Sequence, residues 1–175
     1  MKDSIVRPSA DPEVQRQFRA ALSMFATGVA VITAPRREGT PIGMTVASFN
    51  SVSLDPPLIL FSVDRRSQSL ADLCVAGSYA VNVLEESQQD MSNRFAKANG
   101  DKWGWRDVAN PRDEPVVLPD TLATFECKPY AQYDGGDHVI FVGRVTRHQT
   151  RSQGRPLIFF GGRYHTLDGV PAVSA

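Results

Sequence analysis

The chain has 175 residues, which is enough for one domain with a substantial core of its own. Nineteen basic residues balance nineteen acidic ones, so no net field attracts nucleic acid or an anionic membrane. No apolar run approaches the ~20 residues of a membrane span, residues 1–10 lack the apolar stretch of a signal peptide, and the two cysteines form no CxxC pair, which predicts a cytoplasmic protein.

The N-terminal part of the chain predicts a loose tail, a helix and a strand. After the tail over residues 1–10, Asp11-Pro12-Glu13 supplies an N-cap, a first-turn proline and an early acid. Apolar residues then recur three and four positions apart, and Gly28 is the expected stop. The β-branched residues of Val29 to Ala34 predict a strand, and Arg36 to Pro41 a turn that makes it the first arm of a hairpin.

The passage from Gly43 to Ser69 predicts two strands around a corner. Hydroxylated side chains alternate with apolar ones from Met44 to Leu54, which indicates a first strand. Asp55-Pro56-Pro57 forces a break, because proline fixes its own φ and pushes the preceding residue into extended geometry. Leu58 to Val63 is then expected to be a buried strand.

The turn that follows combines two arginines with Ser67 and Ser69 and leads into a short helix over Leu70 to Val75. Either serine is a candidate N-cap, and the N–H groups of a first helical turn suit a phosphate. An ordinary capped helix beside two solvated arginines is the alternative interpretation of the same turn.

The second half of the chain is mostly strand-like. Asn82 is a polar residue within an apolar strand and needs a partner if it is buried. We expect strands over Ser78 to Leu84, Thr121 to Tyr133, His138 to Thr150 and Leu157 to Phe160, a helix over Gln88 to Ala98, and a long loop over Asn99 to Pro119. Asp134-Gly135-Gly136-Asp137 predicts a hairpin between the third and fourth of these strands.

Many strands, few helices and no regular βαβ alternation predict a mainly β fold, a barrel with peripheral helices. No glycine pattern matches a Rossmann or P-loop site, and no G-x-S-x-G elbow marks a serine hydrolase. The three histidines lack a metal-ligand spacing, so no metal site is expected. His138 ranks above the other two, because it ends a glycine turn where backbone approaches a ligand closely.

Six motifs in order resemble those of a known family. They are FRAALSMFATGVAVIT, GMTVASFNSVSLDPPLILFSV, SYAVNVL, RFA, GGDHVIFVGRV and GRYHTL, and together they extend from Phe18 to Leu167. The chain resembles the short-chain flavin reductases, flavin reductase-like proteins with an FMN-binding split β-barrel that serve as reductase components of two-component flavin monooxygenases. The resemblance implies a domain over residues 11–168, with a C-terminal tail over residues 169–175.

The resemblance also implies a function and a site. The chain is expected to pass hydride from NADH, or NADPH, to FMN or FAD, to form a homodimer and to supply a separate monooxygenase. No catalytic side chain is required, because the cofactors carry the chemistry. The implied cofactor-binding residues are Thr45, Val46, Ala47, Ser48, Ser62, Val63, Ser67, Ser69, Asn82, Arg94, Phe95, His138 and Tyr164.

Within this set the expected roles differ. The flavin ring lies against the two strand segments, its phosphate near Ser67 and Ser69, and the nicotinamide beside His138 and Tyr164. Relatives commonly carry an asparagine where this chain has Ala47, so only a backbone contact is expected there.

Other interpretations remain open at this point. Thr45 and Ser48 could hydrogen-bond across strands, and Phe95 could belong to the core. The chain could also be a split-barrel oxidase acting directly on a substrate, a non-enzymatic flavin-binding or redox-sensing protein, or a barrel for another ligand. The sequence does not distinguish FMN from FAD.

Overall fold

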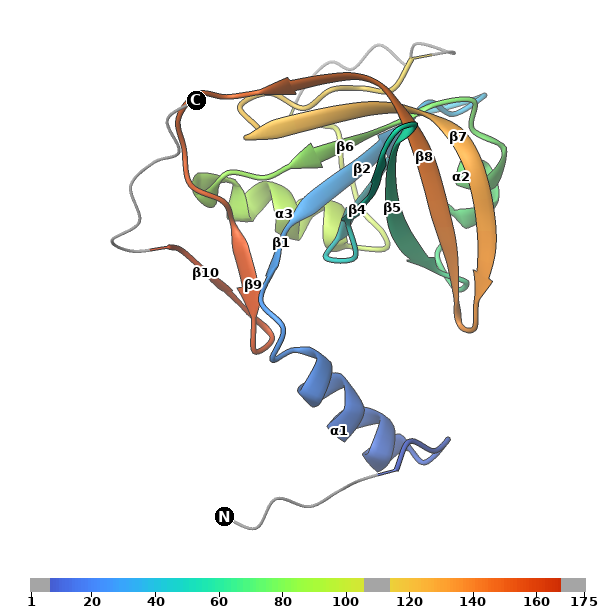
Figure 1. Ribbon diagram of the computed structural model, residues 1–175, viewed down its shortest axis with the longest axis vertical. Coiled ribbons are helices and arrows are strands. Elements are labelled where there is room, and N and C mark those ends of the chain that lie inside the picture. Colours follow the sequence, from blue (N-terminus) through green and yellow to red (C-terminus); the bar gives the residue numbers. More distant parts are fainter. Residues whose placement is uncertain (1–6, 106–113, 168–175) are drawn as a thin grey trace.

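The structure, a computed structural model, describes residues 7–105 and 114–167. Its first element, α1 (Pro12–Leu22), stands away from the body of the molecule (Figure 1). The predicted cap is confirmed, because the Asp11 carboxylate accepts a 2.7 Å hydrogen bond from the Glu13 N–H. The helix ends at Leu22, before the expected stop at Gly28, and none of its residues is buried.

A seven-stranded antiparallel sheet forms the body in the order β3-β2-β6-β7-β8-β5-β4. The mainly β prediction is therefore confirmed. The sheet curls strongly, and its long β7-β8 hairpin arches over the remaining strands (Figure 1). Its strands are β2 (Ala30–Ala34), β3 (Ile42–Val46), β4 (Asn50–Leu54), β5 (Pro57–Asp64), β6 (Tyr79–Val83), β7 (Ala123–Gly135) and β8 (His138–Thr150).

The prediction of one strand from Met44 to Leu54 is wrong. The chain leaves β3 after Val46, and β4 starts at Asn50. These two strands lie at opposite ends of the sheet order, and the curl brings β3 into contact with β5. Ser48 fixes the connection, because its hydroxyl accepts a 2.9 Å bond from the Ser62 N–H and donates to the Ser62 carbonyl at 3.2 Å. A tertiary contact thus divides a stretch whose local pattern is continuous.

A second, three-stranded sheet carries the C-terminal part of the described chain. It has the order β1-β9-β10, with β1 at Thr27–Gly28, β9 at Ile158–Phe160 and β10 at Arg163–His165. The sequence predicted only β9. The remaining elements are α2 (Leu70–Val75), the 3-10 turn Glu86–Gln88 and α3 (Gln89–Ala96). None of the helices within the described ranges is both long and apolar enough to cross a membrane.

Two hydrophobic clusters lie on opposite faces of β2. Ala30 and Ile32 belong to the cluster enclosed by the curled sheet, while Val29 and Val31 pack with Phe95 of α3. Strand residues alternate between faces, so consecutive apolar side chains must feed both clusters. The predicted strand is confirmed, and all of its residues in β2 are buried.

Asn82 has the partners that its burial requires. Its amide donates to the Val31 carbonyl at 3.0 Å and to Thr33 Oγ1 at 3.2 Å, and its carbonyl accepts a 2.9 Å bond from the Leu118 N–H. Asn82 therefore ties the segment before β7 to the sheet. Most of the predicted loop over Asn99 to Pro119 is described, but residues 106–113 lie outside the described ranges. Residues 1–6 of the predicted N-terminal tail, residue 168 and the predicted C-terminal tail over residues 169–175 also lie outside them.

Candidate active site

A cavity of about 1010 Å³ lies where β3 meets the ends of β5 and α3. Its lining combines strand backbone with hydroxyl, ammonium and apolar side chains. The lining residues are Met44, Thr45, Val46, Ala47, Ser48, Ser62, Val63, Asp64, Arg66, Ser67, Gln68, Ser69, Phe95, Ala96, Lys97, Ala98, Lys102, Gly135, His138 and Ile140. All residues implied by the family resemblance except Asn82, Arg94 and Tyr164 are in this set.

The wall formed by β3 is suited to a planar, hydrogen-bonding ligand. β3 is an edge strand with β2 as its only sheet neighbour among the described strands. An edge strand leaves backbone N–H and C=O groups on its other side for further partners. Thr45 is oriented by a 2.7 Å bond from its hydroxyl to the Ser92 carbonyl of α3, so the wall has a fixed geometry.

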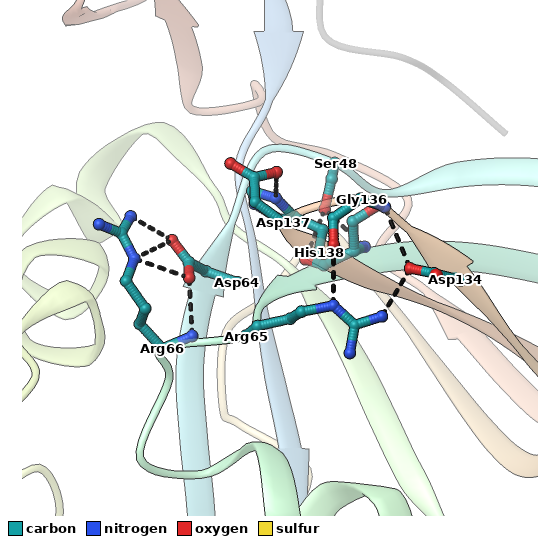
Figure 2. A network of polar contacts seen from close by, with 9 residues as sticks. Ser48, Asp64, Arg65, Arg66, Asp134, Gly136, Asp137 and His138 are labelled. Atoms are coloured by element: carbon teal, nitrogen blue, oxygen red, sulfur yellow. Dashed lines mark hydrogen bonds and ion pairs between the residues drawn. The ribbon is translucent and has the colours of Figure 1, made fainter. Parts of the chain in front are cut away.

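The arginines of the turn after β5 are already paired with carboxylates (Figure 2). Arg65 reaches the β7-β8 turn, where it donates to the Gly136 carbonyl at 2.8 Å and to Asp134 at 2.6 Å. Arg66 folds back on Asp64 with a closest contact of 2.6 Å, and this hydrogen bonding holds the pKa of the Asp64 carboxyl well below its usual range. Arg65 does not line the cavity, and Arg66 lines it as half of an ion pair.

The short helix after this turn contributes less to anion binding than the sequence suggested. α2 has only six residues, and Ser69 occupies its N-cap position without a side-chain capping bond. The Ser67 hydroxyl accepts only a long 3.4 Å bond from the Ser69 N–H. Both hydroxyls line the cavity, so a phosphate here would rest on hydroxyls and nearby cations more than on the helix dipole.

Sequence reasoning missed two cationic residues of the cavity, Lys97 and Lys102. The Lys102 ammonium donates to the Gly43 carbonyl at 2.8 Å and to the Phe95 carbonyl at 3.3 Å. Burial lowers the pKa of Lys102, and the nearby Arg36 lowers it further. No local pattern marked this lysine, because it lies in an irregular segment and its shorter bond is to Gly43, 59 positions away in the sequence.

His138 stands at the start of β8, on the cavity wall formed by the hairpin. Its Nδ1 lies 2.7 Å from the carboxylate of Asp137 (Figure 2). An ionised carboxylate only accepts hydrogen bonds, so Nδ1 carries the proton in this pair and Nε2 is left for a ligand. The side chain is 41% exposed, which leaves it accessible from solvent.

The three implied residues outside the cavity lining have other surroundings. Asn82 is fully buried in the network described above. Arg94 is exposed on α3. Tyr164 packs on the second hydrophobic cluster, and its hydroxyl lies 2.8 Å from Ser92 Oγ. Ser92 in turn accepts the hydrogen bond from Thr45 through its backbone carbonyl. Within the described part of the chain, no group of three or more His, Cys, Asp or Glu residues could hold a metal ion.

Comparison with known proteins relates this chain to a family. The model of the flavin reductase like domain matches residues 22–168. The FMN reductase (NADH) SmoA of Agrobacterium fabrum is 47% identical over 155 residues, covering 87% of this chain and 86% of the relative. HsaB of Rhodococcus jostii, the reductase subunit of a flavin-dependent monooxygenase, is 36% identical over 173 residues, covering 98% of this chain and 86% of the relative.

Two further matches concern length and fold. A probable flavin reductase of Rhizobium meliloti is 45% identical over 131 residues, or 75% of this chain, but the chain spans only 42% of that relative's length. The NADH:FAD oxidoreductase SgcE6 of Streptomyces globisporus, solved in complex with NAD and FAD fragments, superposes with a TM-score of 0.82 at 33% identity, covering 93% of this chain and 98% of that one.

Proposed function

Because the chain belongs to the flavin reductase-like domain family, with its split-barrel fold, we propose that it is an NADH:flavin oxidoreductase. Hydride passes from the nicotinamide to the flavin when both are bound, and that chemistry belongs to the cofactors. The observation that carries the proposal is the cavity beside β3, which combines an open strand edge with hydroxyl and ammonium groups. NADH as the hydride donor is supported by the similarity to SmoA, which is an FMN reductase (NADH).

The chain's task in this reaction is alignment. The flavin ring lies along Thr45 to Ser48 and the facing residues Ser62 and Val63, where backbone groups can contact its polar edge. Phe95 closes the cavity on the α3 side and excludes water from the ring. Holding two reactants in contact geometry supplies much of the rate enhancement in a transfer that needs no protein nucleophile.

The cavity offers different groups to the flavin phosphate and to the nicotinamide. Ser67, Ser69 and Lys102 line it and bind the flavin phosphate through hydroxyl and ammonium donors. On the wall formed by the β7-β8 hairpin, His138 presents Nε2 to the nicotinamide, while Asp137 fixes the ring through Nδ1. The role of His138 is to place the nicotinamide, because hydride transfer requires no proton from the protein.

The reduced flavin is supplied to a separate flavin-dependent monooxygenase. HsaB is described as the reductase subunit of such an oxygenase, and it aligns with nearly the whole of this chain. The cavity is open to solvent at exposed residues such as Ala47 and Ala98, which suits a flavin that is exchanged.

We also propose a homodimer, built on the apolar surface of α1 and the residues after it. Phe18, Leu22, Met24 and Phe25 are between 50% and 77% exposed. Contiguous apolar surface of this kind marks interaction sites in proteins. Light scattering coupled to gel filtration measures the mass directly, and a mass of one chain at micromolar concentration would refute the dimer.

NADH oxidation by the purified chain, followed with no flavin and then with FMN or FAD, tests the proposed activity. Oxidation should be negligible without flavin and saturable with it. A flavin-binding protein without reductase activity would show flavin binding but no NADH oxidation. Oxidation that ignores added flavin would point to a different acceptor and would overturn the proposal.

A further inference from the structure

The turn between β7 and β8 precedes His138 and bears on how its ring is held. Gly135 pairs with His138 at the end of the ladder, so Gly136 and Asp137 form a two-residue turn. Gly136 has a φ of 75°, a left-handed conformation that glycine adopts readily. The last pair that β8 makes with β5 is His138 with Asp64, so the turn lies beyond the part of the hairpin that the sheet holds.

Arg65, the first residue after β5, reaches across to this turn (Figure 2). Its backbone N–H donates to the Asp137 carbonyl at 2.9 Å, and its Nε donates to the Gly136 carbonyl at 2.8 Å. Its Nη2 donates to a carboxylate oxygen of Asp134 at 2.6 Å, and the same oxygen accepts a 3.2 Å bond from the Gly136 N–H. We call these three bonds from Arg65 the Arg65 clamp.

The Arg65 clamp holds the backbone on both sides of Asp137. The carbonyl that precedes Asp137 is that of Gly136, the carbonyl that follows is its own, and Arg65 donates to both. The Asp137 carboxylate in turn lies 2.7 Å from Nδ1 of His138. Arg65 is thus connected to the His138 ring through Asp137, although it does not line the candidate flavin cavity.

The side chains involved are too exposed for the clamp to act mainly through stability. The side chains of Arg65, Asp134 and Asp137 are 46%, 79% and 85% exposed. Ion pairs between exposed side chains contribute little to the free energy of unfolding. The guanidinium of arginine is instead a rigid planar fork that fixes direction at two acceptors at once. The clamp therefore contributes geometry at the turn more than it contributes stability.

We propose that Arg65 is a positioning residue for the nicotinamide, because it holds Asp137 and through Asp137 sets the His138 ring. This inference rests on the proposed reductase function and on the role proposed there for His138. Loss of the clamp leaves His138 on β8 but frees its ring from one orientation. A small misplacement of reacting groups can slow a reaction by about 100-fold. Flavin binding is unaffected, because the proposed flavin contacts are on β3, β5 and the segment leading into α2.

Arg65→Met tests the proposal, because it keeps the length of the side chain and removes its donors. The kcat/KM for NADH should fall about tenfold, with slower flavin reduction in stopped flow. The Kd for flavin should change by less than about twofold and the melting temperature by less than about 4 °C, since the side-chain pair is exposed. Arg147→Met is the matched control, because Arg147 pairs with Glu126 across the same two strands at 2.6 and 2.8 Å and does not line the cavity. It should leave kcat/KM unchanged.

A double-mutant cycle with His138→Asn shows whether Arg65 acts through His138. In the His138→Asn background, Arg65→Met should lower kcat/KM by less than about twofold, because the ring that it positions is gone. Asp134→Ala provides an independent variant, since it removes only the exposed acceptor of the clamp. It should lower kcat/KM for NADH in the same direction by up to about fivefold and leave flavin affinity unchanged.

An equal loss of kcat/KM in both backgrounds would overturn the inference, because Arg65 would then act on NADH without His138. Wild-type kcat/KM in both Arg65→Met and Asp134→Ala would overturn it as well, as would a loss of flavin affinity that matches the loss of kcat/KM. In each of these cases the wild-type chain still oxidises NADH with flavin, so the reductase function stands. A wild-type chain without that activity would refute the function and this inference together.

Discussion

Replacement of Gly43 by alanine should damage the wall of the candidate flavin cavity. Gly43 lies in β3, and a Cβ added to it would come within 2.5 Å of Phe95 Cδ1 and 3.3 Å of Trp103 Cζ2. Carbon atoms pack at about 3.5 Å or more, so the Phe95 ring would have to retreat by about 1 Å. Phe95 is only 1% exposed and packs edge-on against Trp103, with ring centroids 5.0 Å apart, so it has little room.

Overpacking of a filled core costs about 1–3 kcal/mol. In a domain of this size, each kcal/mol lowers the melting temperature by about 2–4 °C, so Gly43→Ala should melt about 2–12 °C below the wild type. Because Phe95 lines the cavity, flavin affinity should fall as well. Gly28→Ala is the control, since a Cβ at Gly28 meets nothing within 4 Å.

Thermal unfolding and flavin titration on the same samples measure both effects. Trimming the ring should relieve the clash, so Phe95→Leu should cost less stability in the Gly43→Ala background than in the wild type. The reasoning would be refuted if Gly43→Ala and Gly28→Ala had the same melting temperature. It would also be refuted if Phe95→Leu lowered the free energy of unfolding equally in both backgrounds.

Three further predictions follow from the site and the core. Ser67→Ala combined with Ser69→Ala should weaken FMN by about 1.5–3 kcal/mol per lost bond and spare riboflavin; equal weakening of both would place the phosphate elsewhere. His138→Asn should raise the KM for NADH and slow flavin reduction in stopped flow while flavin affinity changes little, and the reverse result would move His138 to the flavin site. Burial raises the pKa of the Cys127 thiol from 9.0 to about 12, so at pH 8 it should react with a thiol reagent only after unfolding. Above about pH 9 the thiol loses its proton in the unfolded chain but keeps it in the folded one. The contribution of the buried thiol to stability is therefore present below about pH 9 and is lost as the pH rises towards 12.

Local patterns in the sequence located most elements of the fold. Asp11 and Pro12 marked the first helix, a β-branched and apolar run marked β2, an apolar run marked β5, and the Gly135-Gly136 pair marked the hairpin. The need of Asn82 for a partner was also correct, since three buried groups bond to it. The helix, the strands and the hairpin depend on residues that are close in the sequence. The requirement of Asn82 for partners depends on the cost of burying an unpaired amide. Sequence alone therefore reveals these features.

Features that depend on distant contacts were missed. The break between β3 and β4 exists because the Ser48 hydroxyl bonds to the Ser62 backbone, and alternation of side chains does not reveal such a bond. Lys102 lies in an irregular segment, and only the folded chain brings it to the carbonyl of Gly43. β1 has two residues and β10 three, which is too short for a periodic signal.

At the arginines of the turn after β5, the sequence predicted a free charge where the fold supplies a partner. Their position beside two serines indicated an anion site, but Arg65 and Arg66 are satisfied by Asp134 and Asp64 in the folded chain. Charge identity is readable from sequence, whereas the pairing of Arg65 with Asp134, 69 positions away, is a property of the fold. The cavity retains its cationic character through the lysines of the α3 side.

Anaerobic mixing of the chain with FMN or FAD and NADH tests the central claim most directly. The flavin absorbance should bleach by one flavin per NADH consumed, and NADH deuterated at the transferred position of C4 should slow the bleaching. A rate that saturates with NADH and carries this isotope effect would be the signature of hydride transfer on the protein. Bleaching no faster than in the protein-free mixture would contradict the account.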